Sequence, residues 1–203
     1  MSKTSTGETK AVRGVGRREF VSKLLSRVPE ALVVSGLGSP TYDVFAAGDR
    51  ETNYYLWGAM GGAAPLGLGL ALAQPDRSVV VVTGDGEQLM GIGSLGTIAV
   101  KQPRNLTIVV LDNGHYGETG MQRSHAGLGS DLVAVARGFG IADAFAVDTL
   151  AGHEEVARRI AARDGVAFAR ILVNADEVPR ALPPRDGPFI KNRFRSALGL
   201  SPF

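Results

Sequence analysis

The sequence predicts an α/β protein with three layers, in which helices cover both faces of a mainly parallel sheet. Several short runs are apolar throughout and rich in valine, as in strands that are buried on both faces. Segments with helical spacing of apolar residues alternate with these runs along the chain. Glycine accounts for 27 of 203 residues, about twice its usual share. This excess indicates tight turns and close approaches of the backbone to a ligand.

Each predicted strand is a short apolar run bounded by turn residues. In chain order the strands are Ala31–Val34, Ser78–Val82, Leu106–Leu111, Ala144–Val147 and Val166–Val173. The fourth run gives the weakest signal. Loops at 35–40, 83–87 and 112–117 follow the first three strands and are rich in Gly, Asp, Asn or Ser. Because ligands of parallel sheets bind at the carboxyl ends of the strands, these loops are the predicted binding edge.

Helices are predicted where apolar residues recur every three or four positions. Phe20, Leu24 and Leu25 show this spacing in the first of them. In chain order the helices are Glu19–Arg27, Gly58–Ala73, Gln88–Lys101, Asp131–Phe139 and His153–Arg163. The second is made largely of small residues, which predicts close packing against a neighbouring element.

The chain is expected to form one domain, 13–178, between two unlike ends. Residues 1–12 are polar, so we expect a disordered start without a signal peptide. The tail, 179–203, contains five prolines and is expected to pack on the domain or on a partner subunit. The longest apolar stretch, 59–73, is too short and too interrupted to span a bilayer. These features predict a cytoplasmic protein that does not enter membranes.

Composition excludes several kinds of function. The net charge of +2 is small, and the basic residues form no single block, which argues against nucleic-acid binding. The absence of cysteine excludes disulfides, thiol nucleophiles and cysteine-ligated zinc or iron–sulfur clusters in this chain.

The first predicted chemical feature is Gly84-Asp85-Gly86, which directly follows an apolar strand and precedes a helix. Its glycines allow the backbone to approach an anion closely, and the N–H groups that open the helix point toward that anion. Asp85 adds a hard oxygen ligand at the same place. This is the arrangement that Mg²⁺ needs to bridge a protein to a diphosphate.

The second chemical feature is the loop that follows the next strand, Asp112 to Gly117. Asn113 offers an amide oxygen and His115 a backbone carbonyl. Asn113 follows Asp85 by 113 − 85 = 28 residues, enough for one helix and one strand, so the two loops can lie on adjacent parallel strands. Asp85, Asn113, the His115 carbonyl, a water and two phosphate oxygens would complete an octahedral Mg²⁺ site.

This spacing resembles the motif of enzymes that depend on thiamine diphosphate (ThDP). The family usually has two asparagines where this chain has Asp112 and Asn113, and the metal ligand of that pair is retained as Asn113. The segment 57–67 also resembles that of 2-oxo acid decarboxylases. There the Met60 position matches the residue that props the cofactor's aminopyrimidine against its thiazolium. The Gly58 position matches the backbone carbonyl that contacts the pyrimidine amine.

The length of the chain leaves room for the pyrophosphate-binding (PP) domain of such enzymes only. The chain resembles the β subunits of sulfopyruvate and phosphonopyruvate decarboxylases, whose pyrimidine-binding (PYR) domain is a separate α chain. The resemblance implies a hetero-oligomer in which the partner supplies a catalytic glutamate, and a reaction that releases CO₂ and an aldehyde from a 2-oxo acid.

The resemblance also implies roles for individual residues. The implied cofactor contacts are Gly58, Met60, Gly84, Asp85, Gly86, Glu87, Asn113, His115 and Tyr116. His115 and Glu118 are the candidates for proton transfer at the mouth of the site. Arg123, His125 and the arginines of the tail are candidates to face a sulfonate or phosphonate.

Plainer interpretations stand beside these roles. Asp85 would also suit a helix cap, Asn113-Gly114 a turn, and Met60 an ordinary core position. Glu87 is either a favourable acid in the first helical turn or a cofactor contact through its N–H group. His115 contributes either its carbonyl alone or also its imidazole.

Two other functions fit the same motif. One is the β subunit of a 2-oxo acid:ferredoxin oxidoreductase, and the other is a ThDP-binding protein without catalysis. A third alternative is a homo-oligomer in which another group replaces the missing glutamate. Binding of NAD is rejected, because the glycine pattern of Gly91–Gly96 lies within a helical segment and does not directly follow a strand.

Overall fold

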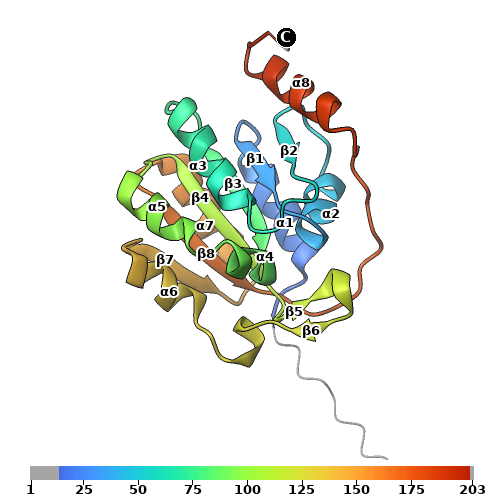
Figure 1. Cartoon of the computed structure of the whole chain (residues 1–203), viewed down its shortest axis with the longest axis vertical. Coiled ribbons are helices and arrows are strands. Elements are labelled where there is room, and N and C mark those ends of the chain that lie inside the picture. Colours follow the sequence, from blue (N-terminus) through green and yellow to red (C-terminus); the bar gives the residue numbers. More distant parts are fainter. Residues whose placement is uncertain (1–13, 202–203) are drawn as a thin grey trace, which may run out of the picture.

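The computed structural model describes residues 14–201, so the predicted disordered start at 1–12 lies outside the described residues. A six-stranded parallel sheet forms the middle layer, in the order β2-β1-β3-β4-β8-β7 (Figure 1). Its strands are β1 (Leu32–Ser35), β2 (Asn53–Tyr55), β3 (Val79–Gly84), β4 (Leu106–Asp112), β7 (Asp143–Val147) and β8 (Ala167–Leu172). The predicted α/β class with three layers is confirmed, and each of the five predicted strands is present.

Helices cover both faces of this sheet, and a separate hydrophobic core lies under each layer. Helices α1 (Arg17–Arg27), α2 (Ser39–Ala46) and α7 (Gly152–Ala162) lie on one face. Helices α3 (Ala63–Ala73), α5 (Ser94–Lys101) and α6 (Leu132–Phe139) lie on the other. In β3 the side chains alternate between the two cores: Val79 and Val81 enter one, Val80 and Val82 the other. This alternation is why the strand is apolar throughout.

Two predicted helices differ from those of the structure, one in where it begins and one in being divided, and glycine residues explain both differences. The predicted helix Gly58–Ala73 begins only at Ala63, because Gly58 and Gly61 have φ values of +74° and +86°. The single predicted helix Gln88–Lys101 is wrong. It is divided into α4 (Asp85–Met90) and α5. The break is at Gly91, where an added Cβ would lie 2.2 Å from the Gly61 carbonyl oxygen.

Six short elements and one full-length helix, α8, were absent from the prediction. They are α2, β2, β5 (His115–Tyr116), β6 (Gln122–Arg123), the 3-10 turns η1 (Gly117–Thr119) and η2 (Ala126–Leu128), and α8 (Gly187–Ala197). Strand β2 has only three residues, which is too few to show a period. Helix α2 begins inside the predicted loop 35–40, with Pro40 in its first turn.

The tail is a long extended segment followed by α8 (Figure 1). Asp186 caps this helix by accepting a hydrogen bond from the N–H of Phe189 at 3.0 Å. Phe194 packs edge-to-face on Tyr54 of β2, with ring centroids 5.5 Å apart. The tail therefore covers the edge strand of the sheet. None of the helices within residues 14–201 is long and apolar enough to cross a bilayer.

Helix α3 offers a matched test of the close packing that its small residues permit. A Cβ on Gly67 would lie 2.2 Å from Val81 Cγ2, whereas a Cβ on Gly69 of the same helix meets nothing within 4 Å. We expect Gly67→Ala to destabilise the protein by about 1–3 kcal/mol through overpacking. Gly69→Ala should instead stabilise it by roughly 0.5–1 kcal/mol through helix propensity. Urea unfolding measures both changes, and equal effects at the two positions would contradict this packing.

Candidate functional site

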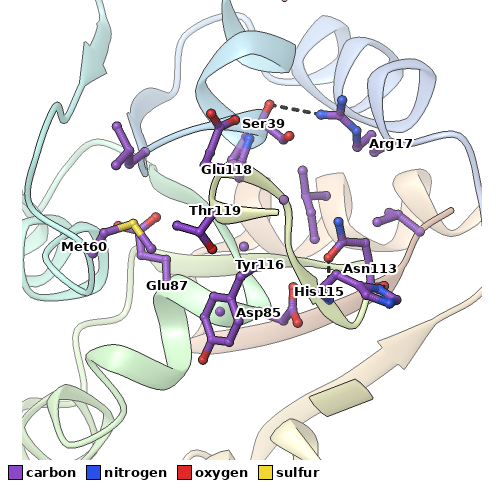
Figure 2. Close-up of a pocket in the computed structure, with 17 residues that line it drawn as sticks. Arg17, Ser39, Met60, Asp85, Glu87, Asn113, His115, Tyr116, Glu118 and Thr119 are labelled. Atoms are coloured by element: carbon purple, nitrogen blue, oxygen red, sulfur yellow. Dashed lines mark hydrogen bonds between the residues drawn. The ribbon is translucent and has the colours of Figure 1, made fainter. Parts of the chain in front are cut away.

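A pocket lies at the carboxyl edge of the sheet and gathers nearly all the residues that the sequence singled out. The predicted residues that line it are Met60, Gly84, Asp85, Gly86, Glu87, Asn113, His115, Tyr116 and Glu118 (Figure 2). Arg17, Ser39 and Thr119 line it as well. Gly58 lies outside this set, in the exposed turn before Met60, so its implied contact with the cofactor stays a prediction.

Asp85 is a buried carboxylate at the start of α4. Only 2% of its surface is exposed, and Ser124 donates a short hydrogen bond to its Oδ2. Burial, helped by the charge of Asp112, raises its pKa to about 6, although the Ser124 hydrogen bond lowers it. Within residues 14–201 no Lys, Arg or His forms an ion pair with it. A buried carboxylate without a protein cation suits a metal ion.

Ser124 was not identified from the sequence. It is 39 residues from Asp85 and fully buried, in the loop between β6 and η2. Its N–H also donates to the Gly114 carbonyl at 2.9 Å, which joins this loop to the one that carries Asn113. No spacing rule could reveal this residue, because only the folding of the β5–β6 hairpin brings it to the site.

Two tight turns shape the loop after β4. The N–H of Gly114 donates to Asp112 Oδ1 and that of His115 donates to Asn113 Oδ1, both at 2.9 Å. An amide oxygen has two lone pairs, so Asn113 Oδ1 keeps one for a metal. The Nδ1 of His115 lies 2.7 Å from the Asn113 carbonyl oxygen, so its imidazole is tied to its own loop. Figure 2 shows His115 beside Asn113, and Glu118 apart from them near Ser39.

Asp112 stands where the ThDP motif usually has asparagine, and Arg170 compensates its charge. Its Oδ2 lies 2.5 Å from Arg170 Nε on the neighbouring strand β8, and the two side chains are 3% and 19% exposed. Arg170 also lies 4.0 Å from Asp131. Arg170 was not singled out, although an arginine inside an otherwise apolar run was a visible signal.

Tyr116 closes over the start of α4. A Cβ on Gly86 would lie 2.5 Å from the Tyr116 ring, so the second glycine of Gly84-Asp85-Gly86 makes room for this aromatic ring. A Cβ on Gly84 would meet nothing closer than 3.7 Å. Gly86 is therefore required by tertiary packing as well as by the approach of a ligand.

Glu118 lies at the rim of the pocket, where it meets the tail. Its Oε2 is 3.2 Å from Arg180 Nη2. Burial raises the pKa of the nearby Tyr42, and the charge of Glu118 raises it further. A second pocket adjoins the first here and is lined by both Glu118 and Arg180.

The other candidates for an anionic group, which are Arg123, His125 and the remaining arginines of the tail, do not line these two pockets. Arg123 is exposed on β6 and donates a short hydrogen bond to the Gly127 carbonyl. His125 begins η2. Among the named candidates it is therefore Arg180 of the tail that the structure brings beside the site.

The fold and the site together define the class of this protein, an α/β domain whose binding residues gather at the carboxyl edge of a parallel sheet. A family model described as thiamine pyrophosphate enzyme, C-terminal TPP binding domain, matches residues 39–171. The chain belongs to this family of ThDP-binding domains, which confirms the predicted resemblance.

Two relatives of this chain are named as decarboxylases. The β subunit of sulfopyruvate decarboxylase from Methanocaldococcus jannaschii is 39% identical over 140 residues, which are 68% of this chain and 73% of the relative. Phosphonopyruvate decarboxylase from Streptomyces viridochromogenes is 36% identical over 184 residues, 90% of this chain and 46% of the relative. This chain thus spans about half the length of the second relative. The predicted ThDP-binding domain is therefore confirmed at the level of the family, and these relatives are named as decarboxylases.

A solved structure supports the fold. The ThDP-dependent 4-hydroxybenzoylformate decarboxylase from Rhodococcus jostii RHA1 matches with a TM-score of 0.68 and 23% identity. The match covers 88% of this chain and 36% of that enzyme. The likeness shows that the same sheet and helices occur as one part of a larger ThDP enzyme.

Proposed function

We propose that this chain binds ThDP through Mg²⁺ and acts as one subunit of a two-chain 2-oxo acid decarboxylase of the sulfopyruvate or phosphonopyruvate type. The observation that carries the proposal is the buried carboxylate of Asp85, which forms no ion pair with a side chain of residues 14–201. This carboxylate shares its pocket with Asn113 and Met60. Carboxylate and amide oxygens are the ligands that Mg²⁺ prefers.

The donor set fits a diphosphate-bound Mg²⁺. Asp85, Asn113 Oδ1 and the His115 carbonyl would hold the metal, and the N–H groups that open α4 would face the diphosphate. Met60, 41% exposed at the pocket, would support the organic part of the cofactor. When bound, ThDP would supply the nucleophile and the electron sink for loss of CO₂ from a 2-oxo acid.

The remaining steps fall to side chains at the pocket mouth. Glu118 is only partly buried and would move a proton there, while Arg180 orients it and balances its charge. His115 is the other candidate, but its Nδ1 is engaged by the Asn113 carbonyl. Among the arginines that the sequence put forward, Arg180 would face a sulfonate or phosphonate of the substrate, while Arg17, which lines both pockets, is paired with Asp43.

The proposal includes a partner. The PYR-domain α subunit would supply the catalytic glutamate, so the active form would be a hetero-oligomer. The names of the β-subunit relatives support a two-chain arrangement. A cytoplasmic location stays a prediction.

Calorimetry of the purified chain with ThDP, with and without Mg²⁺ and with and without the α subunit, tests the proposal. We expect Mg²⁺-dependent binding that tightens with the partner, and CO₂ release from sulfopyruvate or phosphonopyruvate only when both chains are present. Absence of ThDP binding in every mixture would refute the proposal. Ferredoxin-dependent formation of acyl-CoA would favour the oxidoreductase over the decarboxylase. Tight ThDP binding without turnover would favour a non-catalytic protein.

A further inference from the structure

The Glu87 side chain does not enter the proposed chemistry, yet it occupies a buried position at the centre of the site. It is 3% exposed, and Thr83 at the end of β3 donates a hydrogen bond to its Oε2 at 2.9 Å. Burial raises the pKa of this carboxylate, whereas the nearby backbone N–H groups of Gly61, Ala63 and Leu37 lower it. Its Oε1 completes no hydrogen bond of normal geometry within the described residues.

These contacts come from three separate connections. Leu37 belongs to the loop after β1, Gly61 and Ala63 to the segment after β2, and Thr83 to the end of β3. The three strands are neighbours in the sheet, in the order β2-β1-β3. The Glu87 side chain thus lies near the segments that follow β1 and β2 and near the end of β3.

The surrounding backbone leaves room for this carboxylate. A Cβ on Gly36 would lie 1.6 Å from Glu87 Oε2, so the Glu87 carboxylate could not keep its observed position beside any larger residue. Glycine at position 36 is therefore a steric requirement of the observed position of the Glu87 carboxylate. The close fit of Gly36 against the Glu87 carboxylate indicates that this carboxylate has a specific structural role.

We propose that Glu87 is a positioning residue, whose carboxylate fixes the Met60 segment relative to the Gly84–Gly86 turn. The inference rests on the proposed function, in which these two parts contact opposite ends of one cofactor. Met60 directly precedes Gly61, whose N–H lies near the carboxylate. Small errors in the placement of such groups reduce catalysis by large factors.

The test compares Glu87→Ala and Glu87→Gln with the exposed control Glu51→Ala. Without cofactor, we expect exchange of the Gly61 and Ala63 amides, followed by NMR, to become at least roughly 10-fold faster in Glu87→Ala. The emission of Trp57, the single tryptophan of the chain, should shift because it lies on the same segment. The amide shape of Glu87→Gln should restore part of both readouts.

With cofactor and partner, Glu87→Ala should weaken ThDP binding by about 10–100-fold, the usual effect of a residue that supports direct ligands. It should lower kcat and leave the KM for the 2-oxo acid nearly unchanged. Gly36→Ala alone should weaken ThDP binding, but should add little in the Glu87→Ala background, where its Cβ has space.

Unchanged amide exchange and Trp57 emission in Glu87→Ala would overturn the positioning role, whether or not the protein binds ThDP. Additive effects of Gly36→Ala and Glu87→Ala would also overturn it. Failure of the wild-type chain to bind ThDP would instead refute the proposed function, and the measurements without cofactor would still decide the role of Glu87.

Discussion

Asp85→Asn is expected to weaken Mg²⁺-dependent ThDP binding by more than about 100-fold while the chain stays folded. The substitution keeps the shape of the side chain and removes the negative charge that a divalent cation requires. Calorimetry with ThDP and Mg²⁺ measures the loss. Asp76→Asn, an exposed aspartate outside the pocket, is the control and should bind as the wild type does. Unchanged affinity in Asp85→Asn would remove the basis of the proposed metal site.

The same variant has an opposite effect on the stability of the metal-free chain. In the folded chain the pKa of Asp85 is about 6, above its ordinary value of 3.8, so the folded state prefers the neutral carboxyl. That contribution to stability is complete below about pH 4 and is lost as the pH rises through about 6. The loss amounts to at most about 3 kcal/mol.

Urea unfolding in EDTA at pH 4.5 and pH 7.5 measures this effect. We expect Asp85→Asn to be more stable relative to wild type at the higher pH, because the variant has no carboxyl to ionise. A difference between the two proteins that does not change with pH would contradict the burial of an uncompensated carboxylate at this position.

Arg170→Leu is expected to destabilise the protein by about 3 kcal/mol. Removal of the guanidinium leaves the Asp112 carboxylate, 3% exposed, buried without a cation. The double variant Asp112→Asn/Arg170→Leu should recover most of this loss, because its amide carries no charge and restores the asparagine usual in the ThDP motif. Chemical denaturation of the single and double variants gives the coupling energy.

Arg158→Leu is the matched control for this cycle. Arg158 pairs with Glu155 at 2.8 Å on α7, but these side chains are 63% and 45% exposed. Its loss should cost less than about 1 kcal/mol, because water screens an exposed pair. Equal effects at positions 158 and 170, or no recovery in the double variant, would show that Arg170 does not compensate Asp112.

The sequence by itself determined the class of the fold and the position of the site. Runs such as Val79–Val82 are apolar on both sides only when both faces of a strand are covered. The α/β class could therefore be predicted from the sequence. Since the carboxyl ends of parallel strands meet at one edge, Asp85 and Asn113 could be placed together before any contact was known.

Only the tertiary structure decided how that edge is held. Ser124 reaches Asp85 through the fold of a hairpin, Arg170 meets Asp112 from the adjacent strand, and the contact of Gly61 with Gly91 divides a predicted helix. Periodicity records which face of an element is buried, because neighbouring residues in the chain share that face. Periodicity does not indicate which distant loop supplies a hydrogen bond or a close backbone contact, because the packing of the elements determines those partners.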